Sequence, residues 1–199
     1  MDTIKYKKIV LDSCILIYAC DQETKEECIK FLQQLIKNRN KITYSSFSAF
    51  EVLKNRQRRE NEKEYTDLLN DIYRIPVDSP TLANAATLHF LYEESGRINK
   101  KKNLKENLVD LKDKFTGDLI IGGTVISYDN HLLLTANKKD FPEPYWKSIY
   151  EYEIKTANNI KIKIYLLDPV MEEIEKKLEK EIVSPDDAPS RQNSYEYRG

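Results

Sequence analysis

One carboxylate interrupts an apolar segment near the start of this 199-residue sequence. Asp12 lies between the runs "IVL" and "ILI", which both have the composition of buried segments. A buried charge is costly unless it is paired, hydrogen-bonded or bound to a metal. Asp12 therefore either caps an element or holds a ligand.

Three further acidic residues occupy comparable places. Glu51 follows the segment "KITYS", Asp118 opens "GDLIIGGTVIS", and Asp140 belongs to the polar cluster "TANKKD" after "HLLL". Helix capping is an alternative explanation for three of the four acids. Asp12 fits an N-cap, Glu51 fits a capping box that begins at Ser48, and Asp118 fits the first turn of a helix, where a carboxylate suits the helix dipole.

The segments that must position these acids alternate between two types. Strand-like or extended segments fall at 8–12, 41–45, 74–78, within 131–141 and at 160–169, and helix-like segments fall at 15–20, 24–39, 48–73, 79–96, 117–129 and 168–182. The charged middle of 48–73 predicts a break or fraying there. Strands separated by helices favour an α/β fold, a central parallel β-sheet flanked by α-helices with right-handed crossovers.

This architecture predicts that the acids meet. Ligands of open α/β sheets bind beyond the carboxyl ends of the strands, where Asp12, Glu51 and Asp118 are expected. Carboxylates that lie close together repel one another and need a cation. Oxygen ligands suit Mg²⁺ and Mn²⁺ and not zinc. A carboxylate-held pair of such ions can activate water and stabilise the leaving oxygen in phosphodiester cleavage.

Four segments of the sequence resemble the signature segments of PIN-domain nucleases, close to the VapC-type toxin ribonucleases. They are "IVLDSCILIYA", "SAFEVLK", "GDLIIGGTVIS" and "LLLTANKKDF", and they occur in the family's order within residues 7–168, with a gap at 97–115. The resemblance implies a PIN-like three-layer α/β/α fold and a metal-dependent endoribonuclease. It also implies that Asp12, Glu51 and Asp118 hold Mg²⁺ or Mn²⁺, with Ser13, Thr135 and Asn137 as supporting polar groups.

One departure from the family's pattern concerns the fourth acid. The family's fourth acid falls where this chain has Asn137, which leaves Asp140 as the expected fourth carboxylate. The departure keeps an alternative open, a non-catalytic PIN-like module that binds RNA or protein. A phosphatase of the haloacid-dehalogenase type is disfavoured, because Cys14 stands where such enzymes need a second Asp.

Basic segments are the candidates for RNA contact, because the net charge of −1 gives the whole chain no strong attraction to nucleic acid. Lys54 and Arg58 are spaced i, i+4 just after Glu51. A Lys-rich insertion at about 97–115, whose later part has apolar residues at helical spacing and is expected to be helical, offers a second patch, which includes Lys100, Lys101 and Lys102. Contacts of these cations with phosphate would supply salt-sensitive affinity.

The remaining features bound the organisation of the protein. We expect one domain over 1–183, with the insertion, followed by a flexible tail at 184–199. No apolar run approaches the roughly 18 residues of a membrane span, and no signal peptide is evident at the start, so we expect a cytoplasmic protein. The three cysteines form no metal-binding or disulfide pattern and are expected to be free thiols. The family resemblance implies a homodimer and a cognate antitoxin or inhibitor protein.

Overall fold

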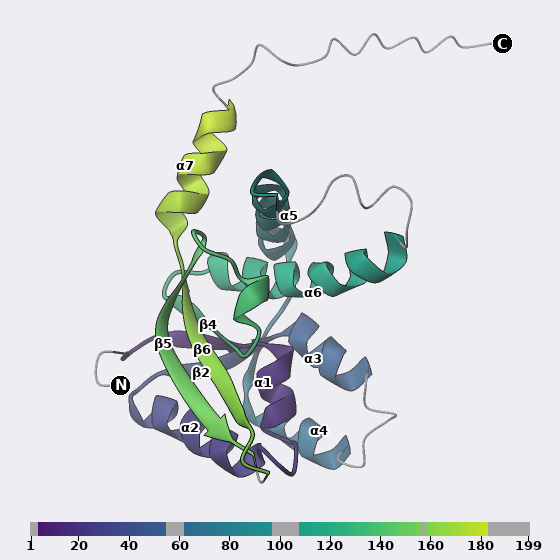
Figure 1. Cartoon of the computed structure of the whole chain (residues 1–199), viewed down its shortest axis with the longest axis vertical. Helices are drawn as coiled ribbons and strands as arrows, with labels where there is room; N and C mark the ends of the chain where they lie inside the picture. Colours follow the sequence, from purple (N-terminus) through teal and green to yellow (C-terminus); the bar gives the residue numbers. More distant parts are fainter. Residues whose placement is uncertain (1–3, 55–61, 97–107, 157, 183–199) are drawn as a thin grey trace, which may run out of the picture.

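A computed structural model of the chain describes residues 4–54, 62–96, 108–156 and 158–182 (Figure 1). Three expectations from the sequence fall on residues outside these ranges. They concern the break within 48–73, the first part of the Lys-rich insertion and the C-terminal tail. No helix in the described ranges combines the length and apolar character that a membrane crossing requires.

Six strands form one sheet in the order β3-β2-β1-β4-β6-β5. The strands are β1 (Lys8–Leu11), β2 (Lys41–Ser45), β3 (Tyr73–Ile75), β4 (His131–Thr135), β5 (Trp146–Lys155) and β6 (Lys161–Pro169). The first four strands are parallel to one another, whereas β6 runs antiparallel to both β4 and β5. The parallel strands therefore end at a common edge, as the sequence predicts.

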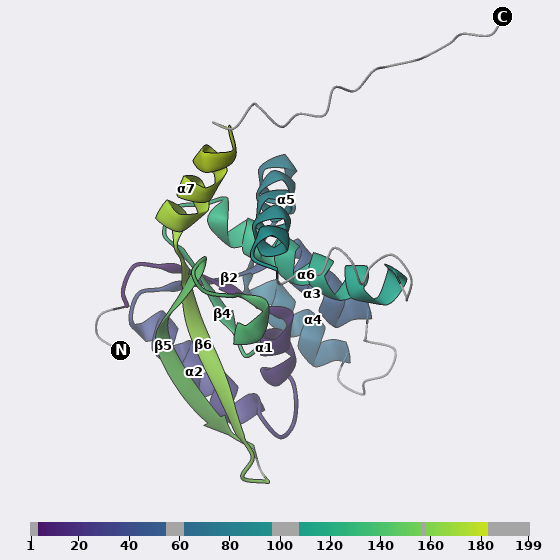
Figure 2. The same cartoon turned by 45° about the horizontal axis from the view of Figure 1, so that its top comes forward.

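Helices cover both faces of the sheet (Figures 1 and 2). They are α1 (Ser13–Tyr18), α2 (Lys25–Lys37), α3 (Ser46–Lys54), α4 (Glu62–Asp71), α5 (Ser79–Glu94), α6 (Leu108–Ile126) and α7 (Met171–Ile182), with a short 3₁₀ helix at Lys138–Asp140. Along β1, Ile9 and Leu11 join a core with residues of α1 to α4, and Val10 joins a second core with residues of α5, α6 and α7. The predicted three-layer α/β/α architecture is confirmed.

The composition of the central strands follows from this layering. A strand that is covered on both faces has no solvent side and reads as a continuous apolar run. Ile9, Val10 and Leu11 are fully buried, and no residue of β4 is more than 4% exposed. A polar residue directly after such a strand is placed at the edge of the core with its side chain still sheltered.

Two antiparallel strands extend the predicted parallel sheet on one side. Strand β5 was not predicted from the sequence, and it pairs with β6 as an antiparallel hairpin with a bulge near Ser148. A short connection between neighbouring strands forces antiparallel pairing. The hairpin extends past the parallel strands and lies against α2, where Phe31 stacks on Tyr150 and Tyr152 (Figure 2).

Two helices begin earlier than the segments indicated at 117–129 and 48–73. Helix α6 begins at Leu108, so the last part of the Lys-rich insertion is helical, as expected, and is continuous with the helix that carries Asp118. Helix α3 begins at Ser46, directly after β2, where Ser45 Oγ accepts a hydrogen bond from the backbone N–H of Phe47. Both differences change the local surroundings of the candidate acids.

Candidate metal centre

Asp12 follows β1 and is nearly completely buried, with 2% of its surface exposed. It occupies the N-cap position of α1, but its side chain makes no capping hydrogen bond. Its Oδ2 accepts hydrogen bonds from Thr135 Oγ1 at 2.6 Å and Cys14 Sγ at 3.1 Å, and its Oδ1 accepts one from Ser13 Oγ at 3.2 Å. The capping explanation is therefore wrong for Asp12. Its hydrogen-bond donors in the described part of the chain are neutral and fix its orientation.

Thr135 connects this carboxylate to the end of β4. Its buried hydroxyl donates to Asp12 and accepts the backbone N–H of Asn137 at 2.8 Å. Asn137 precedes the short 3₁₀ helix, which ends at Asp140, and its side chain makes no capping bond there. The structure thus brings Ser13 and Thr135 to Asp12 and places Asn137 and Asp140 on the segment that follows.

Glu51 reaches the same region from α3. The capping-box explanation is wrong, because Ser48 lies inside the helix and its hydroxyl donates to the Leu11 carbonyl at 3.1 Å. A Cβ atom built on Gly117 would lie 2.7 Å from Glu51 Oε1, so the carboxylate packs against the backbone of α6. Burial raises the pKa of Glu51, a hydrogen bond with Ser13 lowers it, and the Asp12 charge raises it.

Asp118 shows that the four acids lie within electrostatic reach of one another. It lies in the interior of α6, so the first-turn explanation is wrong. Its pKa is raised from 3.8 to about 8, and burial is the largest cause. The charges of Asp12, Asp140 and Glu51, in that order, contribute to the same increase, and Lys139 partly offsets it. Acids from the end of β1, from α3, from α6 and from the 3₁₀ helix therefore repel one another at this edge of the sheet.

The chemistry of these side chains fits a hard cation. Four carboxylates supply only oxygen ligands, which Mg²⁺ and Mn²⁺ prefer. Burial raises the pKa of the Cys14 thiol well above its usual range, so Cys14 stays protonated and acts as a donor, not as a soft ligand. Within the described ranges no three acidic, His or Cys side chains are close enough to form a ready-made metal site. Ion binding therefore requires the carboxylates to move closer together or to bind through water.

Two contributors to the site were not predicted from the sequence. Cys14 was expected only to be a free thiol, but it also accepts the backbone N–H of Ala136 at 3.3 Å and so links α1 to the end of β4. Gly117 gives Glu51 the space that it occupies. On the same helix as Glu51, Phe50 is 55% exposed and contacts Phe47 with ring centroids 5.7 Å apart.

The expected RNA-binding residues are only partly described. Lys54 lies exposed in the last turn of α3, and its charge lowers the pKa of Glu51. Arg58, Lys100, Lys101 and Lys102 lie in segments outside the described residues. Of these expected contacts, Lys54 is therefore the one whose position next to the acids is known.

The fold resembles that of solved toxin–antitoxin proteins. The sequence matches no protein-family model and no curated protein. A chain of VapBC2 from Rickettsia felis, in a structure bound to a DNA fragment from its promoter, aligns with a TM-score of 0.51 and 21% identity over 67% of this chain and 90% of that chain. The chain has a VapC-like PIN fold. At this identity the likeness concerns the fold alone.

Two further structures align less closely with this PIN fold. VapBC from Salmonella typhimurium bound to DNA has a TM-score of 0.47 with 16% identity, over 68% of this chain and 90% of that chain. FitAcB from Neisseria gonorrhoeae has a TM-score of 0.49 with 16% identity, over 67% of this chain and 90% of that chain. The predicted resemblance to the PIN fold is confirmed by the first alignment.

Proposed function

We propose that this protein is a Mg²⁺- or Mn²⁺-dependent endoribonuclease that hydrolyses RNA phosphodiester bonds. The observation that carries the proposal is the pKa of Asp118, which is raised to about 8 by burial and by three other acids. A fold gains nothing from gathering repelling carboxylates in a sheltered place unless a cation neutralises them. Helix capping does not explain Asp12, Glu51 or Asp118, and capping is the simplest structural reason for acids at such positions.

Asp12, Glu51, Asp118 and Asp140 are the residues that would hold the ion. When bound, Mg²⁺ or Mn²⁺ supplies a Lewis acid that activates water and stabilises the leaving oxygen. Thr135, Ser13 and Cys14 hold Asp12 in one orientation through their hydrogen bonds. Asp118, with its raised pKa, must lose a proton before it can bind a cation, so metal affinity rises with pH up to about pH 8.

The exposed face of α3 supplies contacts for the RNA. Lys54 offers a cation for a phosphate close to Glu51, and the exposed ring of Phe50 offers a surface on which an unpaired base can stack. Both side chains lie on the same element as an acid of the site. A single-stranded substrate is therefore the form of RNA that this surface suits.

The proposal extends to partners of the protein. The VapBC2 proteins are known as a complex bound to promoter DNA. By likeness of fold, we propose that a cognate antitoxin or another inhibitor protein binds this chain and that the chain forms a homodimer. Sedimentation of the purified chain, alone and with the product of a neighbouring gene, tests both points without measuring nuclease activity.

A non-catalytic PIN-like module that binds RNA or protein is the second candidate. Two observations favour it. Asn137 stands where the PIN family has its fourth acid, and no three acidic side chains in the described ranges form a ready-made cluster. This candidate retains RNA or protein binding but predicts no metal-dependent cleavage.

Cleavage of total RNA and of an unstructured oligonucleotide by the purified protein distinguishes the two candidates. We expect cleavage with Mn²⁺ or Mg²⁺, none in EDTA, and none for Asp12→Asn or Asp118→Asn. The matched control is Asp67→Asn, which neutralises an exposed carboxylate on α4 and leaves cleavage unchanged. RNA binding without cleavage in any metal would support the non-catalytic candidate. Metal-dependent cleavage that survives unchanged in both Asp12→Asn and Asp118→Asn would refute the assigned site.

A further inference from the structure

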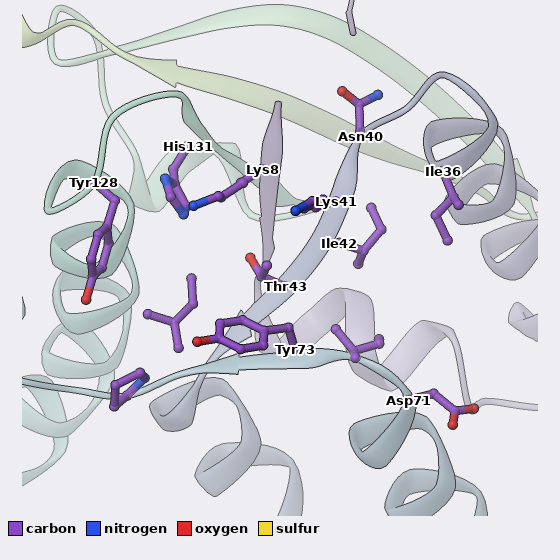
Figure 3. A pocket seen from close by; sticks show the side chains of 13 residues that line it. Lys8, Ile36, Asn40, Lys41, Ile42, Thr43, Asp71, Tyr73, Tyr128 and His131 are labelled. Atoms are coloured by element: carbon purple, nitrogen blue, oxygen red, sulfur yellow. The ribbon is translucent and has the colours of Figure 1, made fainter. Parts of the chain in front are cut away.

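A cleft of about 660 Å³ opens at the opposite end of the parallel strands from the acids (Figure 3). It lies where β3 stops short of its neighbour. Pairing of β3 with β2 begins at Thr43 opposite Tyr73, so Lys41 and Ile42 extend beyond the end of β3. The cleft occupies this notch. The cleft has no part in the proposed nuclease reaction.

Three basic residues form a row along one side of the cleft. The strand register places Lys8 of β1 directly beside Lys41 of β2 and His131 of β4, and all three line the cleft. Neighbouring strands are about 4.8 Å apart, and side chains at paired positions share a face. The Lys8 charge adds to the effect of burial in lowering the pKa of His131. His131 is therefore uncharged near pH 7, and the positive charge of the row comes from Lys8 and Lys41.

The two lysines of this row lack counter-charges. In the described ranges, neither the Lys8 nor the Lys41 ammonium group takes part in an ion pair or a side-chain hydrogen bond. Like charges that lie side by side repel, and an anion between them removes the repulsion and gains charge-assisted hydrogen bonds. The row is thus suited to an anionic group such as a phosphate.

Apolar and aromatic side chains make up most of the rest of the cleft, and Asn40, Thr43 and Asp71 also line it. Tyr73 is 72% exposed and Tyr128 is 37% exposed, although both are large rings that prefer to be covered. Figure 3 shows the Tyr73 ring facing the cleft across from Lys8 and Lys41. Ile42 also lines the cleft. These groups suit a flat ring system next to the anion.

We propose that this cleft binds a nucleotide, with its phosphate between Lys8 and Lys41 and its base against Tyr73. The volume lies within the range of roughly 300–1,000 Å³ that is usual for small-molecule sites. Asp71 at the rim offers a carboxylate that can accept hydrogen bonds from ribose hydroxyls or from an amino group of the base. The combination of cations, exposed ring and acceptor matches the three parts of a nucleotide.

The cleft is separate from the candidate metal centre. Lys8 begins β1 and Asp12 follows its end, four positions along the strand, which corresponds to roughly 13 Å. The proposal therefore stands or falls independently of the proposed nuclease activity. Binding experiments in EDTA, with no divalent ion, test the cleft alone.

Isothermal titration of the purified full chain with AMP, GMP, CMP and UMP tests the proposal. Adenosine supplies the ring alone, and inorganic phosphate supplies the anion alone. We expect at least one nucleotide to bind, and to bind at least about tenfold more tightly than either fragment, because the two contacts are made together. Absence of binding by all four nucleotides would overturn the proposal. Equal binding of inorganic phosphate would overturn the assigned ring contact.

Variants assign the binding to the cleft. The double change Lys8→Ala with Lys41→Ala is expected to weaken nucleotide binding by about tenfold or more, because charged hydrogen bonds are lost. Tyr73→Ala is expected to weaken it, and Tyr73→Phe to retain it. All three side chains are exposed, so the variants should fold, which circular dichroism checks. Lys155→Ala, an exposed lysine on β5, is the matched control. Binding that is unchanged in the double variant, or lost in Asp118→Asn, would place the nucleotide elsewhere.

Discussion

Replacing Asp118 with Asn should stabilise the metal-free protein, and the gain should depend on pH. The folded-state pKa of Asp118 is about 8, against an ordinary value of 3.8. Between these values the folded protein holds a proton that the unfolded chain releases. Stability therefore falls as pH rises through this window and stays low above about pH 8. Asn resembles the protonated acid in shape and cannot ionise, so the variant does not lose this stability as the pH rises.

The size of the effect follows from the same two pKa values. At roughly 1.4 kcal/mol per pH unit, the span from 3.8 to about 8 gives a ceiling of roughly 6 kcal/mol in the free energy of unfolding. Asp118 keeps some contact with solvent, and the other acids of the cluster relax when it changes. We therefore expect about half of the ceiling, about 3 kcal/mol, at pH 8. At pH 4 the two proteins should differ by less than about 1 kcal/mol.

Urea denaturation followed by circular dichroism, in EDTA at pH 4, 6 and 8, measures these differences. Groups that titrate equally in both proteins cancel when the variant is compared with the wild type. Adding Mn²⁺ at 100 times its dissociation constant should stabilise the wild type by about 2.7 kcal/mol and the variant far less. A difference between the two proteins that is constant with pH, or a variant that is less stable at pH 8, would show that Asp118 does not belong to a repelling cluster.

Two further variants probe the support of the site, and a third probes the N-cap of α5. Gly117→Ala should lower Mn²⁺ affinity in titration calorimetry, because its Cβ would lie 2.7 Å from Glu51 Oε1 and 2.8 Å from Phe47 Cε1, so both side chains must move. Unchanged affinity would contradict this. Thr135→Val should cost about 2 kcal/mol in urea denaturation and abolish cleavage, since Asp12 loses its shortest hydrogen bond, and Thr135→Ser should retain both properties. Asp78→Ala should lower the melting temperature near neutral pH, because hydrogen bonding from Thr81 lowers the pKa of Asp78, and the loss should shrink as pH falls below about 4. A loss that persists in acid would rule out that cause.

The convergence of the acids could be predicted because it depends on topology alone. Parallel strands that alternate with helices bring their carboxyl ends to one edge, and Asp12 follows a strand that the sequence marks clearly. Glu51 lies in the helix that directly follows β2, so its approach to this edge needs no knowledge of side-chain packing. The ordered resemblance to PIN-domain segments then supplied the chemistry.

The helical character of the residues before Asp118 could be predicted, because Leu108, Leu111 and Phe115 recur at helical spacing and run directly into the segment of Asp118. The position of the helix start could not be predicted. The sequence suggests a separate start beside Gly117, whereas helix α6 runs without a break from Leu108 through Asp118. Asp118 therefore reaches the site from the middle of a helix, and local sequence patterns locate helix boundaries only approximately.

The hairpin of β5 and β6 and the cleft escaped the sequence analysis because both depend on pairing. The bulge near Ser148 interrupts the alternation that marks a strand, and tertiary packing on Phe31 stabilises the ribbon. The row of Lys8, Lys41 and His131 exists only once the register of three strands is known. Lys8 and Lys41 are 33 positions apart in the sequence, and His131 lies 90 or more positions from both. The sequence alone does not show that such distant residues are neighbours in the sheet.

The hydrogen bonds of the acids suggest an order in which a cation would be bound. Asp12 is held by three donors from Ser13, Cys14 and Thr135, so its oxygens are fixed before any ion arrives. Asp118 instead carries a pKa of about 8 and is largely protonated at pH 7. A cation therefore meets a prepared ligand first and recruits Asp118 only by displacing its proton, which makes the complete site a product of metal binding. Because Asp118 stays protonated until a cation displaces its proton, the repulsion among the acids is reduced in the metal-free protein. The sheltered cluster can therefore exist without unfolding the protein.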